Sequence, residues 1–326
     1  MASTITINKI TDFCSTQAEL MPLSGVGGYL NEPALSLAND TLQQLLAYGI
    51  PWKFNRVEMP LLVLRSFHQD QQFAGACAFT QSGGVGIALA SASGITESGF
   101  TVTVNTLDTH DFAVGQTVYM TGNTVAAYNS TFTQNGTLSQ WSGGWTILST
   151  PTTKSFTFTH ASSGLATSGA PGITDFGWLE SATMTDQFDG SALPNIWPVR
   201  AVRTLQPSSV SGTPRTISVV SVPSTGVLKI RVSPVPGGTA WGAALVYQAK
   251  APLKTALTDT WAPFPDELSF VYRQAFLARC YRFLDSRRAD GEFQKAQAAI
   301  LLALGHDDSE ASEESVSPET SLMGGL

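Results

Sequence analysis

The side chains best suited to chemistry are scattered along this chain. Four of them are histidines that stand far from one another: His68, His110, His160 and His306. A metal site needs ligands at short, regular spacings, and these histidines have neither a His-x-x-x-His pair nor a cysteine companion. Asp186 and Asp189 lie in a stretch that resembles a Ca²⁺ loop, but no glutamate stands six residues after Gly190. A turn is the better interpretation of that stretch.

The cysteines and the glycine-rich stretches do not form a reactive site either. Cys14, Cys77 and Cys280 are far apart and odd in number, which favours buried free thiols. The stretches Gly25-Val-Gly-Gly and Gly83-Gly-Val-Gly-Ile lack the Lys-Ser/Thr pair of a phosphate-binding loop, so we expect flexible turns. Without a recognisable set of nucleophile, base and orienting group, the sequence predicts no enzyme activity, no cofactor and no metal.

Near the C-terminus, arginines and aromatic residues share one predicted helix. Five arginines could contact phosphate: Arg273, Arg279, Arg282, Arg287 and Arg288. Asp285, Asp290 and Glu292 alternate with them, which favours a solvated face or salt bridges between subunits. Three aromatic residues lie off the main apolar stripe and indicate either a second buried face against a neighbouring chain or a wider core. The candidate subunit interface is therefore Tyr272, Arg273, Phe276, Arg279, Arg282 and Phe283.

The first 82 residues predict a mixed, partly helical segment. A helix opening at Asn31 or Ser36 is expected to run through a leucine-rich stretch and to stop before Pro51, which disfavours helical backbone at the preceding residue. Residues 52–60 are typical of extended chain. Residues 61–72 fit a strand or a short helix equally well.

Residues 83–172 differ in composition from the segments on either side, because Gly, Ser and Thr dominate them. Alternating β-branched and aromatic residues between glycine and asparagine breakers occur in Phe100–Asn105, in Gln116–Met120 and in Ser155–His160. This pattern predicts an inserted all-β domain, a barrel or a sandwich. Its glycine-rich flanks resemble hinges.

Residues 173–304 predict a second β region followed by helices. Two strands, 216–222 and 227–232, are expected to form a hairpin through Pro223-Ser-Thr-Gly226, and residues 239–250 supply a third strand. Asp266 is the expected N-cap of a helix that runs to Leu284. A second helix is expected from Glu292 to Leu304, so the two helices would form a C-terminal hairpin. The predicted fold class is therefore α+β.

The charge distribution separates the end of the chain from its body. Only 13% of the 326 residues are charged, and the net charge is −7. Residues 305–326 contain neither lysine nor arginine but six acidic residues: Asp307, Asp308, Glu310, Glu313, Glu314 and Glu319. Without them the body is almost neutral, which argues against a basic face that grips nucleic acid. We expect residues 305–326 to form a flexible acidic tail and the charge-poor body to belong to an assembly. No signal peptide or membrane span is expected.

Three stretches of residues 83–172 resemble a β module common in the tail and neck proteins of tailed bacteriophages. They are Thr109-His-Asp-Phe-Ala-Val-Gly-Gln-Thr-Val-Tyr-Met-Thr-Gly, then Ala127-Tyr-Asn-Ser-Thr-Phe, and then Lys154-Ser-Phe-Thr-Phe-Thr. The chain departs from that pattern at Phe112, where leucine is usual, and at Ser130, where glycine is usual. The resemblance implies a phage structural protein without indicating which one.

The C-terminal stretch from Trp261-Ala-Pro-Phe-Pro-Asp-Glu-Leu to Leu304 resembles the terminal helices of phage head-to-tail adaptor proteins, which include tail tubular protein A of short-tailed phages. The resemblance implies a virion ring, usually of about twelve copies, that joins the portal protein to the tail or nozzle. Double-stranded DNA would pass through its lumen without specific binding. Such a protein is assembled in the host cytoplasm and ends at the head-tail junction of the virion.

Two further hypotheses concern the tail of the chain and other functions. Leu322, Met323 and Leu326 are candidate portal-docking residues, because they are apolar anchors in an otherwise polar segment, although a merely solubilising tail is the alternative. Another tail, baseplate or fibre component is the nearest competing function. A carbohydrate-binding module is a more distant one, suggested by Tyr128, Trp141 and Trp145 as sugar-stacking side chains.

Overall fold

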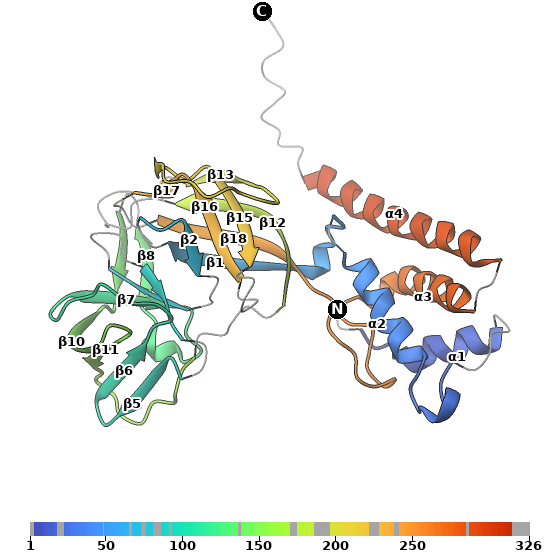
Figure 1. Ribbon diagram of the computed structural model, residues 1–326, viewed down its shortest axis with the longest axis horizontal. Coiled ribbons are helices and arrows are strands. Elements are labelled where there is room, and N and C mark those ends of the chain that lie inside the picture. Colours follow the sequence, from blue (N-terminus) through green and yellow to red (C-terminus); the bar gives the residue numbers. More distant parts are fainter. Residues whose placement is uncertain are drawn as a thin grey trace, which may run out of the picture. The chain divides into compact units, whose positions relative to one another are not determined.

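A computed structural model describes residues 3–17, 23–47, 49–64, 67–72, 76–80, 86–90, 93–135, 138–169, 175–185, 196–221, 228–237, 241–284 and 287–314. The chain divides into two compact units, which are Met1–Arg56 with Gln248–Leu326, and Val57–Tyr247. The first unit is helical, and the second is built from strands (Figure 1). The mixed α+β class expected from the sequence is confirmed.

Within its described residues, the helical unit contains four α-helices and short 3₁₀ segments. The α-helices are α1 (Ile7–Gln17), α2 (Ala34–Leu45), α3 (Ser269–Phe283) and α4 (Ala289–Glu314). The 3₁₀ segments are η1 (Val26–Gly28), η2 (Lys53–Asn55) and η4 (Asp266–Leu268). Helices from both ends of the chain share one hydrophobic core, so the two ends must come together for this unit to fold.

Aromatic residues from the two ends of the chain fill the middle of this core. Trp261 stacks on Tyr272 of α3 with ring centroids 4.9 Å apart, and it meets Phe276 edge-on at 5.6 Å. Trp52 meets Phe264 edge-on at 5.4 Å. Because offset-stacked and edge-to-face pairs each add roughly 0.5–1.5 kcal/mol beyond the area they bury, these rings fix how the unit packs.

Helix α1 lies in the N-terminal stretch to which the sequence analysis assigned no specific element. Ile7, Ile10 and Cys14 are all buried at a spacing of three and four residues, which is the spacing of a helix face. Cys280 of α3 is buried in the same core, and its pKa is raised by the neighbouring Cys14 thiol and by burial. The prediction that these cysteines are buried free thiols is confirmed.

Asp266 does not cap α3 in the way the sequence predicts. The N-cap of η4 is Pro265, and α3 begins only at Ser269. The Asp266 carboxylate instead accepts hydrogen bonds from the backbone N–H groups of Thr4 and Ile5, at 3.1 and 3.3 Å, and from the hydroxyl groups of Ser3 and Thr4. Tertiary contact with the N-terminal segment therefore takes the carboxylate that a local cap would have used.

Helix α4 also differs from its prediction, because it begins at Ala289 and continues past Gly305 to Glu314. The sequence analysis ended this helix at Leu304 and placed a flexible tail after it. A single glycine costs a helix only about 1 kcal/mol relative to alanine, and most of the residues that follow are tolerated in helices. Residues 315–326 lie outside the described part of the chain.

The unit Val57–Tyr247 contains two seven-stranded sheets. The first has the order β1-β18-β12-β13-β15-β16-β2. Its strands are β1 (Arg56–Leu64), β2 (Asp70–Gln72), β12 (Phe176–Thr185), β13 (Ile196–Ala201), β15 (Thr216–Ser221), β16 (Leu228–Ser233) and β18 (Trp241–Ala249). β15 and β16 pair antiparallel from Thr216↔Ser233 to Ser221↔Leu228, as the predicted hairpin requires, although its turn lies outside the described residues. A short ladder, β14 (Ser211–Gly212) with β17 (Val235–Pro236), belongs to the same region.

The second sheet has the order β4-β3-β7-β10-β11-β6-β5. Its strands are β3 (Cys77–Phe79), β4 (Gly86–Ala88), β5 (Ile95–Ser98), β6 (Thr101–Asn105), β7 (Thr117–Thr121), β10 (Trp145–Thr152) and β11 (Ser155–Thr159). The 3₁₀ segment η3 (Ala126–Tyr128) and the ladder of β8 (Thr131–Asn135) with β9 (Leu138–Ser142) complete this region. β6 and β7 alternate buried side chains with more exposed ones, as the sequence predicts. Four of the five residues of β11, which lies between β10 and β6, are buried.

The expected domain boundaries at residues 82/83 and 172/173 stay predictions. β3 precedes residue 83 but pairs with both β4 and β7, so this strand belongs to the second sheet. The core of that sheet extends from Ala76 to Phe158. The compact unit that contains it also contains the first sheet.

Candidate interaction surface

The histidines of the second sheet hold the backbone in place. The His110 ring bonds through Nε2 to the Ser155 carbonyl oxygen at 3.0 Å, and its Nδ1 accepts from the Phe112 N–H at 3.3 Å. His160 uses Nδ1 in the same way with the backbone of Ser162. In the part of the chain that the structure describes, no three His, Cys, Asp or Glu side chains gather as metal ligands would. Asp186, Asp189 and Gly83 lie outside that part.

The residues that depart from the phage β-module pattern are accommodated in the same sheet. Phe112 is buried in its core. The Ser130 hydroxyl accepts a hydrogen bond from the Met120 N–H at 3.1 Å and donates one to the Gly143 carbonyl oxygen at 3.0 Å. The serine thus links two backbone segments that a glycine would leave without this bridge.

The aromatic residues suggested as a sugar platform are in the interior. Tyr128 and Trp141 are buried. Trp145 is only partly exposed, and its ring stacks on Phe158 with centroids 4.8 Å apart. Sugar stacking needs exposed ring faces, so these three residues give no support to carbohydrate binding.

The six residues of the candidate subunit interface divide into two groups. Tyr272 and Phe276 are fully buried in the core of this chain, so the wider-core interpretation is right for them and they are unavailable to a neighbour. Arg273 is half-buried, with its guanidinium carbon 4.8 Å from the centroid of the Phe13 ring. Phe283 is 56% exposed. The surface available to a partner is therefore the end of α3 that carries Arg279, Arg282 and Phe283.

A groove of about 780 Å³ lies beside these last residues, formed by α2, α3 and α4. The groove is lined by Gln44, Ala275, Ala278, Arg279, Arg282, Arg287, Ala289, Asp290, Phe293 and Ala296. Ala275, Ala278 and Ala296 are almost completely buried at its floor. Side chains this small leave the space between neighbouring helices unfilled, which is why a groove forms there.

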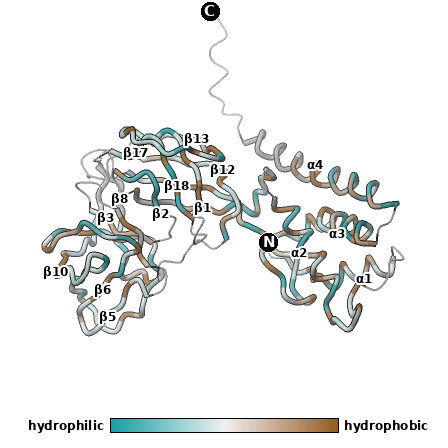
Figure 2. The backbone as a smooth tube through the Cα atoms, viewed as in Figure 1, coloured by the Kyte–Doolittle hydropathy of each residue, from teal (hydrophilic) through white to brown (hydrophobic). Residues whose placement is uncertain are grey.

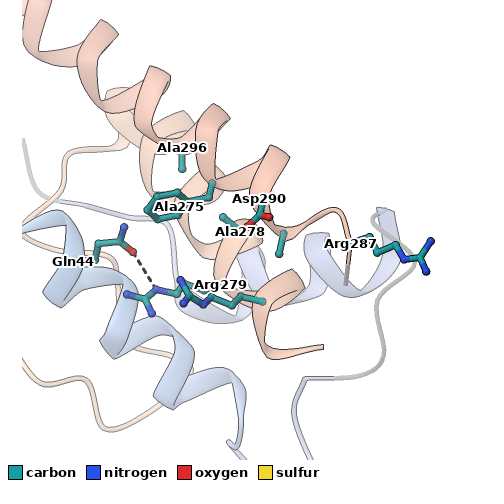
Figure 3. A pocket seen from close by; sticks show the side chains of 10 residues that line it. Gln44, Ala275, Ala278, Arg279, Arg287, Asp290 and Ala296 are labelled. Carbon is teal, nitrogen blue, oxygen red and sulfur yellow. Dashed lines mark hydrogen bonds between the residues drawn. The ribbon is translucent and has the colours of Figure 1, made fainter. Parts of the chain in front are cut away.

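The rim of the groove is positively charged. Among the described residues that line it, Arg279, Arg282 and Arg287 are basic and Asp290 alone is acidic. Arg279 is held by a hydrogen bond from its Nε to Gln44 Oε1 at 3.0 Å, and Figure 3 shows this pair at one end while Arg287 lies apart from it. Arg282 and Arg287 are exposed. A groove with an apolar floor and a cationic rim suits an anionic segment that also carries apolar groups.

Beyond the groove, α4 exposes apolar side chains. Leu301 and Leu302 are 69% and 66% exposed, and the hydropathy colouring in Figure 2 shows brown segments along this helix. Exposed leucines next to one another are typical of a surface that a partner covers. The candidate portal-docking residues Leu322, Met323 and Leu326 lie outside the described residues.

Comparison with known proteins points to one class. A family model described as SU10 adaptor protein matches residues 170–319, a stretch that includes β12, α3, α4 and all three groove arginines. The match covers a little less than half of the chain and supports a phage structural adaptor protein. Among curated proteins and solved structures nothing matches the chain. Within the described residues, no helix is long and apolar enough to span a membrane.

The sequence predicted the arginines of this surface but not the groove. Interleaved acids favoured a solvated face or salt bridges between subunits, and Arg282 and Arg287 are indeed exposed. Among the described residues of the chain, none of Arg279, Arg282 and Arg287 forms an ion pair. The sequence feature that could have indicated the groove is the set of small residues Ala275, Ala278 and Ala296. Ala278 follows Ala275 by three residues, and Ala296 follows Ala278 by eighteen. Only the packing of α3 on α4 brings the three alanines together at the floor of the groove.

Proposed function

We propose that this chain is a head-to-tail adaptor that forms a ring beneath the portal vertex of a tailed bacteriophage and joins it to the tail or nozzle. The observation that carries this proposal is the adaptor-family match over residues 170–319, which includes both C-terminal helices. A relation to tail tubular protein A, a ring of about twelve copies and the passage of double-stranded DNA belong to the same proposal.

The balance of acidic and basic residues supports a protein that does not bind the DNA passing through it. Outside residues 305–326 acidic and basic residues are almost equal in number. A lumen that gripped phosphates through many lysines and arginines would release counterions and hold the duplex tightly, which would oppose ejection. A nearly neutral body lets DNA pass, and binding energy is then reserved for the protein partners.

The helices at the end of the chain distinguish an adaptor from other virion proteins. A fibre or spike is expected to remain β-rich to its end, whereas this chain ends its described part with α3 and α4. Their exposed residues, Phe283 with Leu301 and Leu302, provide an apolar surface for neighbouring subunits or the portal. Leu322, Met323 and Leu326, which lie outside the described residues, are the proposed portal anchors.

The test is the mass of the purified chain by light scattering, alone and then with its cognate portal. We expect a monomer that becomes a ring of about twelve copies only on the portal. A stable trimer that does not bind the portal would instead identify a fibre or spike component and overturn the proposal.

The same measurement on a full-length variant tests the portal anchors. Leu322→Ser, Met323→Ser and Leu326→Ser together should abolish or strongly weaken docking while leaving the monomer unchanged, because apolar anchors supply the binding energy of a polar tail. Unchanged docking would show that Leu322, Met323 and Leu326 do not anchor the chain on the portal.

A further inference from the structure

The arginine-rimmed groove between α2, α3 and α4 requires an occupant with negative charge. Three arginines and one aspartate line it, and none of the three arginines has an ionic partner among the described residues. Arg279 is bound to a neutral amide, which orients the guanidinium without cancelling its charge. The groove therefore has a defined lining and an excess of positive charge, and Arg279 at its rim is held in one orientation.

Its shape favours a peptide over nucleic acid. The floor consists of alanines with Phe293 beside them, and it lies between helices, where it can receive side chains of a narrow segment. A DNA duplex is a broad convex partner whose phosphates are usually matched by several lysines and arginines spread over an open face. Outside residues 305–326 acidic and basic residues are almost equal in number, which argues against such a face.

The chain itself contains a segment of the required chemistry. Residues 305–319 contain all six of the acidic residues near the C-terminus and neither lysine nor arginine, and α4 carries the first five of the acids up to Glu314. An acidic helix end and a groove with three arginines are complementary in charge. Arginine–carboxylate pairs are also among the strongest hydrogen bonds that such surfaces form.

The segment cannot reach the groove of its own chain. Both lie on α4, which lines the groove with Ala289, Asp290, Phe293 and Ala296 and then continues without a break to Glu314. At ~1.5 Å per residue, Asp307 lies about 16 Å and Glu314 about 27 Å along the helix beyond Ala296. A continuous helix cannot fold back over that distance, so the acidic segment that fills the groove must belong to another copy.

We infer that the acidic segment 305–319 of one copy docks into the Arg279–Arg282–Arg287 groove of the next copy. This inference rests on the proposed ring, and it names the contact that would close it. The donor and the acceptor are different surfaces of the same chain, so each copy gives one segment and receives one. Contacts of this heterologous kind generate rings when the rotation closes.

A binding experiment with a peptide tests the contact directly. The probe is a fluorescein-labelled peptide of residues 305–326, titrated into the full-length chain whose own six acids are replaced by amides (Asp307→Asn, Asp308→Asn, Glu310→Gln, Glu313→Gln, Glu314→Gln, Glu319→Gln). We expect saturable binding that weakens at least tenfold when Arg282→Gln and Arg287→Gln are added, and that weakens with salt. Arg288→Gln is the matched control, because this arginine neighbours Arg287 but does not line the groove.

Two results would overturn the inference. One is peptide binding that is absent, or that is unchanged by Arg282→Gln and Arg287→Gln. The other is a short DNA duplex that binds with the same arginine dependence while the peptide does not, which would make the groove a phosphate-binding site.

A charge swap distinguishes this contact from the proposed function. One full-length variant carries Arg282→Glu and Arg287→Glu, and the other carries Glu310→Lys, Glu313→Lys and Glu314→Lys. Neither should assemble on the portal alone, and an equal mixture should, because each groove then meets a tail of opposite charge. A ring that forms on the portal from either variant alone overturns only the inference. Peptide binding without any ring on the portal leaves the contact intact and overturns the proposed function.

Discussion

At the scale of single residues, Asp266 connects the beginning of the chain to the beginning of the C-terminal helices. The hydrogen bond from the Thr4 hydroxyl, together with those from the backbone N–H groups of Thr4 and Ile5, lowers the pKa of Asp266 below its ordinary value of 3.8. A carboxylate with a depressed pKa stabilises the fold at pH values above the unfolded pKa. That stabilisation is lost as pH falls through the folded pKa.

Asp266→Asn should therefore lower the melting temperature at pH 7, and the difference from the unsubstituted chain should shrink toward zero as the pH falls through the lowered pKa of the folded state. Melting curves followed by circular dichroism between pH 7 and pH 2 measure this. Glu267→Gln removes the neighbouring exposed carboxylate and is the control. A difference that stays constant across this range would mean that the Asp266 contacts do not depend on its charge.

Phe276 and Phe283 lie on the same helix and should respond in opposite ways. Phe276 is fully buried, so Phe276→Ala is expected to destabilise the monomer by about 3–5 kcal/mol. Phe283 is 56% exposed, so Phe283→Ser should leave the monomer stable while weakening association on the portal. Urea unfolding and light scattering measure the two effects. Portal association that survives Phe283→Ser would remove this residue from the proposed subunit surface.

At the scale of elements, α4 is the helix whose length matters most for function, because its far end carries the acidic segment. Gly305 is exposed and lies within α4, and a side chain added there would meet no other atom. Glycine in a helix interior costs roughly 0.5–1 kcal/mol relative to alanine. This position therefore controls how firmly residues 306–314 join the helix.

Gly305→Ala should increase helicity and slow amide hydrogen exchange in residues 306–314. Gly291→Ala, in the first turn of the same helix, is the matched control and should leave exchange in that segment unchanged. Exchange rates in 306–314 that do not respond to Gly305→Ala would show that glycine does not limit the helix there.

At the scale of the whole molecule, the helical unit and the second sheet have separate cores. The helical core draws only on residues up to Phe54 and from Ala251 onward, whereas the core of the second sheet lies between Ala76 and Leu165. A segment with its own core can be removed without exposing the core of its host. We therefore expect the region of the second sheet to be dispensable for assembly.

Replacing residues 76–172 by a short Gly-Ser linker should leave the helical unit folded and the association on the portal unchanged. Circular dichroism at 222 nm and light scattering measure the two properties. If the shortened chain fails to associate on the portal, the β segment is part of the subunit contact.

Local patterns in the sequence were sufficient to predict elements whose stability depends on residues nearby in the sequence. The alternation in Thr101–Asn105 predicted β6, and the pairing of β15 with β16 followed from two short alternating runs. The leucine-rich helix was predicted within a few residues of its observed bounds, Ala34–Leu45. In each case the spacing of apolar residues already determines which face is buried, so no distant contact is required.

Only the tertiary structure decided the roles that depend on contacts between distant residues. Asp266 has the chemistry of a cap, yet it binds Ser3–Ile5 because the two ends of the chain meet in one unit. Tyr272 and Phe276 have the chemistry of an interface, yet Trp261 covers them. The sequence by itself determined the composition, the acidic end and the local periods. Burial and charge complementarity depend on which helices pack together, and three alanines become a groove only after that packing is formed.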